Sequence, residues 1–129
     1  MEGSLKLKEI SYIHCDVYSG GELKHGSIAL IDKGTAVITL LTQEALRDKM
    51  ISNVREVTTR GGNIFAVVNE ADITSKEVVD DLVYIPKTID LLTPMISVVP
   101  LQLISYYVAK QKGCDVDKPR NLAKSVTVE

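Results

Sequence analysis

Three charged residues near the N-terminus have the spacing and the chemistry for proton transfer. On a helix with 100° per residue, Glu2, Lys6 and Glu9 fall within an arc of about 60°. Ser11 lies roughly opposite this arc. The residues that flank the arc are apolar: Leu5, Ile10 and Tyr12. We therefore expect the charges on the more apolar face of the helix, where an amphipathic helix ordinarily carries leucine or valine.

This stripe of charges has two interpretations. The two glutamates can pair with Lys6 at i,i+4 and i,i+3 spacing, as an ion-pair ladder on a solvated face. Alternatively, a partly buried carboxylate transfers a proton, and the lysine sets its charge state. The spacing alone does not decide between the two.

His25 and Lys124 are two further candidates. His25 follows Gly20-Gly21 and precedes Gly26, so the backbone can turn tightly and bring the imidazole close to a ligand. Lys124 is the one charged residue between positions 121 and 128, and a lysine beside apolar residues can act as a nucleophile toward carbonyl groups. Taken alone, each also fits an ordinary exposed side chain.

The elements that must position these residues follow from hydrophobic patterns. Residues 36–41 and 64–68 are short, β-rich and apolar on both faces, as strands covered by helices on both sides are; residues 82–85 are a third candidate. Residues 2–14, with His14 on the flank, and residues 43–60 show helical spacing, and Gly61-Gly62 ends the second helix. Strand, helix and strand at this length predict a crossover, a parallel sheet and the α/β class.

Residues 91–109 carry no charge, which nearly reaches the length of a membrane span. The stretch also contains residues that are unusual in a span: Pro94, Pro100 and Gln102. A buried helix in a soluble α/β protein is therefore favoured. We expect this helix to have Thr93 as its N-cap, to kink at Pro100 and to end at Gly113. Residues 115–129 show neither helical nor strand periodicity and are expected to form an extended tail.

The composition is that of an ordinary globular protein of one domain. The chain has 129 residues, of which 45% are hydrophobic and 25% charged, with a net charge of −2. No basic excess calls for a nucleic-acid partner, and no export signal or membrane segment is expected, so the predicted location is the cytoplasm. Cys15 and Cys114 are too few and too widely spaced for a disulfide framework, and we expect reduced thiols.

The expected sheet is short. The chain begins in a helix, whereas doubly wound domains usually begin with a strand, so we expect a domain truncated at its N-terminus that lacks its first strand. Because an uncovered strand edge favours pairing with another chain, we also expect a homodimer or a higher assembly.

Three segments together resemble one enzyme family. They are Glu2-Gly-Ser-Leu-Lys-Leu-Lys-Glu-Ile-Ser-Tyr-Ile-His14, Gly21-Glu-Leu-Lys-His-Gly26 and Asp117-Lys-Pro-Arg-Asn-Leu-Ala-Lys-Ser-Val-Thr-Val-Glu129. In this order, and with the last one at the C-terminus, they resemble the C-terminal end of glutamine–fructose-6-phosphate aminotransferases, also called glucosamine-6-phosphate synthases. The resemblance runs from the first residue to the last.

The resemblance implies an architecture and a set of partners. It implies a three-layer α/β/α sugar-isomerase (SIS) subdomain with a short parallel sheet over residues 1–114, and an extended tail that covers the active site over residues 115–129. The family's glutaminase and first SIS subdomain, whose Ser/Thr-rich loop holds the sugar phosphate, are missing from the chain. The family converts fructose 6-phosphate and glutamine-derived ammonia to glucosamine 6-phosphate, with no metal or other cofactor expected. The isolated chain is therefore expected to be inactive or nearly so.

The resemblance also assigns roles. Glu9 matches the base that moves a proton between C1 and C2 of the open-chain sugar, and Lys124 matches the lysine that forms an imine with the ketose carbonyl. His25 matches the histidine that assists ring opening across the dimer interface. The residues that match groups lining the substrate are Glu2, Lys6 and Ala123. Ser27 stands where the family usually has proline, and the loss of that rigid turn can loosen the placement of His25.

Two alternatives stay open. The first is an SIS-type glucosamine-6-phosphate deaminase, which runs the reverse chemistry without a glutaminase. The second is a non-catalytic module that binds a sugar phosphate or dimerises. The ending Lys124-Ser-Val-Thr-Val-Glu129 favours the aminotransferase, and a sugar-phosphate sensor would need a phosphate loop of its own, which the sequence does not contain.

Overall fold

The computed structural model describes residues 1–70, 72, 74–120 and 122. These residues form two compact units. One comprises residues 18–97, and the other comprises residues 1–17 together with the chain from residue 98 onward. Each unit is described by itself.

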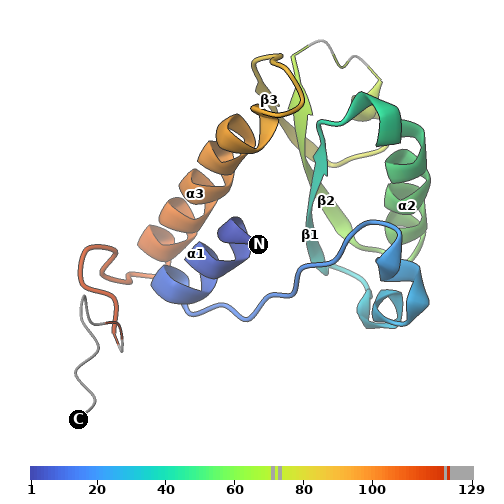
Figure 1. The fold of residues 1–129 in the computed structure, drawn as a ribbon. Coiled ribbons are helices and arrows are strands. Elements are labelled where there is room, and N and C mark those ends of the chain that lie inside the picture. The colour runs from blue at the N-terminus through green and yellow to red at the C-terminus, as the bar shows by residue number, and fades with distance from the viewer. Residues whose placement is uncertain (71, 73, 121, 123–129) are drawn as a thin grey trace. The chain divides into compact units, whose positions relative to one another are not determined.

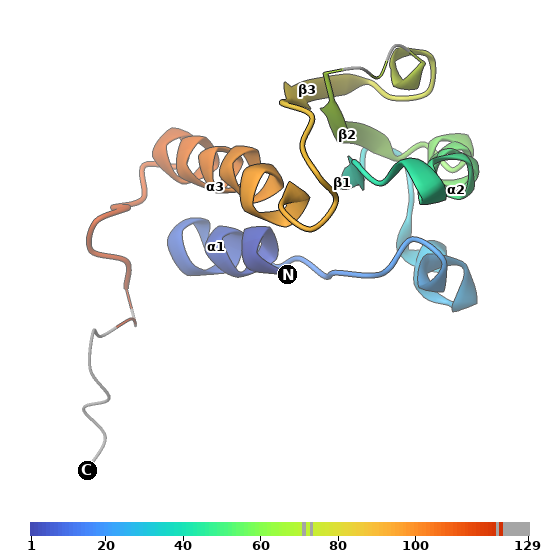
Figure 2. The same cartoon turned by 45° about the horizontal axis from the view of Figure 1, so that its top comes forward.

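The unit of residues 18–97 contains a parallel sheet. Among the described residues, the strands Ala36–Leu41 (β1), Asn63–Asn69 (β2) and Asp81–Ile85 (β3) pair in the order β1-β2-β3 (Figures 1 and 2). Both pairings are parallel, with Val37 beside Ile64 and Val67 beside Val83. The predicted strands, the parallel sheet and the α/β class are therefore confirmed.

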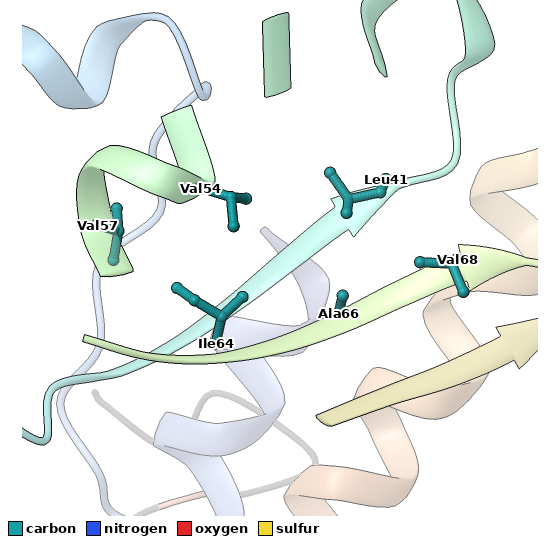
Figure 3. Close-up of a cluster of buried hydrophobic side chains, with 6 residues drawn as sticks. All are labelled: Leu41, Val54, Val57, Ile64, Ala66 and Val68. Atoms are coloured by element: carbon teal, nitrogen blue, oxygen red, sulfur yellow. The ribbon is translucent and has the colours of Figure 1, made fainter. Parts of the chain in front are cut away.

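One helix covers one face of this sheet. After a short 3₁₀ helix, Glu44–Leu46 (η3), the helix Arg47–Thr59 (α2) packs Val54 and Val57 against the strands. Figure 3 shows this core between α2 and the sheet. Its members are fully or almost fully buried: Leu41, Val54, Val57, Ile64, Ala66 and Val68. Because strand side chains alternate between faces, these strand residues all point to the α2 side.

The opposite face of the sheet is also apolar. On this face Ile38 lies beside Phe65 and Leu40 beside Val67. Ile38 and Leu40 are 43% and 42% exposed, whereas Val67 is fully buried.

Two glycines end α2 as predicted. Gly61 has a φ of 87°, and its N–H donates to Thr58 O while the N–H of Gly62 donates to Val57 O. This pair of bonds is the Schellman motif, in which the left-handed position favours glycine. Gly62 also packs closely, because a Cβ atom there would lie 2.7 Å from Cγ1 of Val57.

The other unit pairs the helix Glu2–Ser11 (α1) with the helix Thr93–Gln111 (α3), which begins in the first unit and continues into this one (Figures 1 and 2). The helices touch through small residues. A Cβ atom on Gly3 would lie 2.8 Å from the Cβ atom of Leu101. The hydroxyl of Ser105 donates a hydrogen bond to the carbonyl oxygen of Gly3 at 3.4 Å. At the other end, Lys112 Nζ donates to Ser11 O at 2.7 Å. The order of these contacts shows that the two helices run parallel.

The predicted helix over residues 2–14 is too long. It ends at Ser11 because Tyr12 adopts left-handed backbone angles, with φ 58° and ψ 29°, while its N–H still donates to Lys8 O. His14 therefore lies beyond the helix and not on its flank. It is exposed, and its Nε2 atom lies 3.7 Å from a carboxylate oxygen of Asp16.

The predictions for α3 are confirmed in part. The helix is continuous through Pro100 and ends in a second Schellman motif, in which Gly113 N–H donates to Lys110 O and Cys114 N–H to Ala109 O. The N-cap prediction is wrong, because Thr93 is already helical and its hydroxyl donates back to Ile89 O. The helix is also not fully buried. The large side chains that it exposes are Met95, Val99, Leu103, Tyr106 and Tyr107.

None of the helices in the described part of the chain is both long and apolar enough to cross a membrane.

Candidate functional site

The charged stripe of α1 forms a row of ion pairs. Lys6 Nζ lies 2.5 Å from a carboxylate oxygen of Glu9 and 3.9 Å from one of Glu2. The side chains of Glu9, Lys6 and Glu2 are 26%, 34% and 43% exposed. The predicted ion-pair ladder is therefore present, with Glu9 as its least exposed member.

The stripe does not lie on the buried face of α1, as we had expected. Ser11, roughly opposite the stripe, is fully buried, and Gly3, about 60° around the helix from Lys6, touches Leu101. Small residues let two helices approach closely, and this contact outweighs the burial of α1's larger apolar residues, of which Leu5 remains 47% exposed. The stripe therefore lies on the half-exposed side of the helix, where the carboxylates can meet a ligand.

Lys6 is the electrostatic centre of the stripe. Its hydrogen bond to Glu9 raises the pKa of Lys6, burial opposes this rise, and the charges of Glu9 and Glu2 add to it. The ammonium group is therefore protonated at neutral pH. It places a fixed positive charge 2.5 Å from a carboxylate oxygen of Glu9.

His25 belongs to the unit of residues 18–97, whereas the stripe belongs to the other unit. It is the last residue of a 3₁₀ helix, Glu22–His25 (η1), and it is exposed. The residues before it are anchored, since Leu23 packs on the core and Lys24 Nζ lies 2.5 Å from a carboxylate oxygen of Glu56 on α2. Gly26 follows with φ 143° and ψ −50°, a conformation that suits glycine, and Ser27 then begins the 3₁₀ helix Ser27–Leu30 (η2). The loop thus presents the imidazole at the surface.

Lys124 and Ala123 lie outside the described residues, so their predicted roles stay predictions. The described chain does approach α1 just before them. The backbone N–H of Arg120 donates to the hydroxyl of Tyr12 at 2.8 Å, and the guanidinium carbon lies 4.2 Å from the centre of the Tyr12 ring. We had assigned no role to either residue. The two residues are 108 positions apart, and the sequence carries no local pattern that predicts their contact.

A second polar cluster was also missed. Arg47 on α2 donates to both carboxylate oxygens of Asp72, at 3.1 and 2.5 Å, and also to the hydroxyl of Thr74. Asp72 accepts further bonds from the backbone of Thr74 and from the backbone and hydroxyl of Ser75, which begins the 3₁₀ helix Ser75–Glu77 (η4). An aspartate followed by threonine and serine is typical of such a turn, so this signal was available in the sequence.

This cluster has a structural role. Burial alone would raise the pKa of Asp72, but the hydrogen bonds from Ser75 and Thr74 and the charge of Arg47 outweigh it and lower that pKa. The Asp72 side chain is only 6% exposed.

A small cavity of about 100 Å³ lies beside the cluster, at the carboxyl ends of β1 and β2. Its lining residues are Leu41, Glu44, Arg47, Asn69, Asp72 and Lys87. Its volume is too small for a sugar phosphate.

Across the residues described in this structure, no group of three or more His, Cys, Asp and Glu side chains is placed to hold a metal ion.

Comparison with known proteins gives a consistent set of relatives. Over its full length the chain is 66% identical to a glutamine–fructose-6-phosphate aminotransferase from Clostridium perfringens and 60% identical to one from Clostridium acetobutylicum. It spans only 22% and 21% of these two proteins, about a fifth of their length.

Solved structures agree with these matches. The C-terminal domain of glucosamine-fructose-6-phosphate aminotransferase from Francisella tularensis matches 90% of this chain with a TM-score of 0.81 and 43% identity, over 33% of that domain. A glucosamine-6-phosphate deaminase from Thermotoga maritima matches 96% of this chain with a TM-score of 0.76 and 27% identity, over 35% of the deaminase. The family model of the SIS domain matches residues 1–110. The chain therefore belongs to the SIS domain family.

Proposed function

We propose that this chain supplies the acid–base part of a sugar-phosphate isomerase centre, which converts fructose 6-phosphate and glutamine-derived ammonia to glucosamine 6-phosphate. The observation that carries the proposal is the Lys6–Glu9 pair, at 2.5 Å on a half-exposed helix face. The proposal is supported by identities of 60% and 66% with aminotransferases over the whole chain.

In this proposal Glu9 is the base. Moving the carbonyl group of a ketose from C2 to C1 requires that a proton leave C1 and that a proton arrive at C2. A single carboxylate beside both carbons can take the first proton and return it. Lys6 and Glu2 would line the same site. Ala123 would contact the sugar beside Lys124.

The other two catalytic roles are proposed from the resemblance. The Lys124 amine would add to the C2 carbonyl and form an imine with loss of water, and ammonia would then displace the lysine. His25 would assist the opening of the sugar ring, which has to precede both steps. His25 is exposed, without a described hydrogen bond, and its loop is anchored to α2, and both features suit a side chain that acts on a ligand.

The proposed assembly extends beyond this chain. The sugar phosphate would be held by another SIS subdomain, because we identify no phosphate loop in this sequence. A homodimer is proposed because apolar side chains of β1 and α3 are exposed. The proposed location is the cytoplasm, which is supported by two cysteines that are both free thiols.

A deaminase is the second candidate, favoured by the structural match to the Thermotoga maritima enzyme. The same proton transfer would serve it, because deamination runs the same isomerisation in reverse. The 27% identity of that match, against 43% for the aminotransferase domain and 66% for the Clostridium perfringens relative, supports the aminotransferase more strongly.

The test is the conversion of fructose 6-phosphate to glucose 6-phosphate, followed with a coupled dehydrogenase assay. The chain is assayed alone and after mixing with a separately produced SIS subdomain that carries a phosphate loop. We expect turnover only in the mixture. Turnover by the chain alone would show that it contains a complete site, and no turnover in the mixture would contradict the proposal.

A further inference from the structure

The loop that carries His25 is attached to α2 and the core at three successive points. Gly20 lies against α2, because a Cβ atom on it would overlap a side chain of that helix. Leu23 packs on the core between α2 and the sheet. The Nζ atom of Lys24 lies 2.5 Å from a carboxylate oxygen of Glu56 on α2. The attachments therefore continue up to the residue directly before His25.

The chain after His25 is attached less closely. Gly26 has φ 143° and ψ −50°, and a Cβ atom on it would meet no atom within 4 Å beyond those of its chain neighbours. The next residue of the described chain that packs against the core is Ile31, six positions after His25, whereas Leu23 lies two positions before it. The placement of the imidazole is therefore determined mainly from the Lys24 side.

We propose that the ion pair between Lys24 and Glu56 positions the imidazole of His25 for opening of the sugar ring. This inference rests on the role proposed above for His25 and adds the residues that place its side chain. Because Lys24 directly precedes His25, a displacement of its backbone moves the imidazole as well. Lys24 and Glu56 are positioning residues, because neither has to touch the sugar.

The ion pair is suited to holding a short segment and contributes little to the fold. The side chains of Lys24 and Glu56 are 39% and 37% exposed, and pairs at such exposure are weak. The attachments of Gly20 and Leu23 remain when the pair is lost, so the loop should stay folded while the segment around His25 is released. The energies typical of an exposed pair correspond to about a two- to fivefold change in the population of the held conformation.

Only a cyclic substrate needs its ring opened. Opening breaks the bond between C2 and the ring oxygen of fructose 6-phosphate, moves the proton of the C2 hydroxyl to that oxygen and leaves C2 as a carbonyl. An analogue that lacks the 5-hydroxyl cannot close this ring, and its 6-oxygen carries the phosphate and cannot close another. The analogue needs the base but not the imidazole. The ion pair should therefore matter for fructose 6-phosphate and not for the open analogue.

The first measurement is independent of activity. In the 129-residue chain, Glu56→Lys turns the attraction to Lys24 into a repulsion, and the hydrogen bond from Arg60 to the backbone carbonyl of residue 56 is kept. In the native chain the NMR order parameter of the His25 N–H should lie near about 0.85, the value of rigid backbone. It should fall toward about 0.6 in Glu56→Lys. An unchanged order parameter would overturn the proposal.

A charge swap tests whether the pairing itself holds the loop. Lys24→Glu combined with Glu56→Lys rebuilds the pair with its charges exchanged, so the native order parameter should return. Asp48→Lys is the control, because it makes the same change in net charge at an exposed position of the same helix, and it should leave the order parameter native. A double variant that is as mobile as Glu56→Lys alone would contradict the proposal.

The second measurement tests the function of the positioned residue. Exchange of the C1 protons with D₂O is followed by NMR for both substrates, in the mixture of this chain with a phosphate-binding SIS subdomain. Glu56→Lys should slow the exchange of fructose 6-phosphate about two- to fivefold and leave that of the open analogue unchanged. The charge swap should recover the native rate. Equal slowing of both substrates would show a merely structural effect and would overturn the proposal.

The outcomes distinguish this inference from the proposed function. If the native chain exchanges neither substrate, the proposed function is wrong, while the order parameter still decides whether the ion pair holds the loop. If His25→Ala slows both substrates alike or neither, the role of His25 is wrong. If His25→Ala slows only fructose 6-phosphate and Glu56→Lys slows neither, the role of His25 holds and its positioning by the ion pair is wrong.

Discussion

Lys6 lies between two carboxylates, and its raised pKa predicts how the stability of the fold depends on pH. A cation whose pKa is higher in the folded state stabilises the fold below its ordinary value of 10.5, and this gain is lost as the pH rises through the raised value. Lys6→Met should therefore lower the free energy of unfolding at pH 7 by about 0.2–1 kcal/mol, since the pair is half exposed. Urea unfolding should show that this difference shrinks as the pH rises above 10.5. A difference that is constant with pH would contradict the proposed electrostatic origin.

Asp72 makes the opposite prediction. The pKa of Asp72 is lowered, so the ionised side chain stabilises the fold at neutral pH. This stabilisation is lost as the pH falls from about 4 through the lowered pKa. Asp72→Asn should cost about 1–3 kcal/mol at pH 7, because hydrogen bonds to a buried charged group are lost. Unfolding at pH 7 and pH 3 should show the gap between the native chain and the variant narrowing in acid. Asp48→Asn, at an exposed position on α2, is the control and should cost less at pH 7.

At the scale of elements, two glycines with similar φ angles test how much the close packing at the end of α2 adds to the cost of a side chain. Gly34 and Gly61 have φ of 89° and 87°. A Cβ atom at Gly34 would meet nothing within 4 Å, whereas one at Gly61 would lie 3.0 Å from Cα of Lys33. Gly34→Ala should cost about 1–2 kcal/mol from the conformation alone, and Gly61→Ala should cost more. Chemical unfolding of the two variants measures this difference. Equal decreases in the free energy of unfolding would show that the structure accommodates a Cβ atom beside Lys33 without an energetic cost.

The elements of the sheet could be predicted because their signals are local. The first two strands are short and apolar on both faces, the third is a short apolar run, and Gly61-Gly62 ends the helix of the crossover. The packing face of α1 could not be predicted, because the contact of Gly3 with Leu101 depends on residues almost a hundred positions apart. The end of α1 was missed for a related reason, since Tyr12 adopts its left-handed conformation in the presence of Arg120.

The candidate site divides in the same way. The Glu2, Lys6 and Glu9 row was predictable because all three residues lie on one helix with fixed geometry. The pairing of Arg47 with Asp72 joins residues 25 positions apart on α2 and the turn after β2, and spacing carries no information about such a pair.

At the scale of the whole molecule, the exposed apolar surface predicts self-association. Ile38 and Leu40 on β1 and Val99 and Leu103 on α3 are each between 42% and 50% exposed. Large apolar side chains at such exposure favour burial against a partner. Sedimentation equilibrium should therefore show a dimer at micromolar concentration. A monomer at all concentrations up to the millimolar range would contradict this prediction.

The central claim is that Glu9 moves the proton between C1 and C2 of a sugar phosphate. The most direct test is exchange of the C1 protons of fructose 6-phosphate with D₂O, followed by NMR, in the mixture of this chain with a phosphate-binding SIS subdomain. We predict exchange with the native chain and a loss of at least about 100-fold in Glu9→Gln, because a positioned general base contributes about that much or more. Asp90→Asn, an exposed carboxylate outside the proposed site, should exchange at the native rate. Exchange by Glu9→Gln at the native rate would contradict the account.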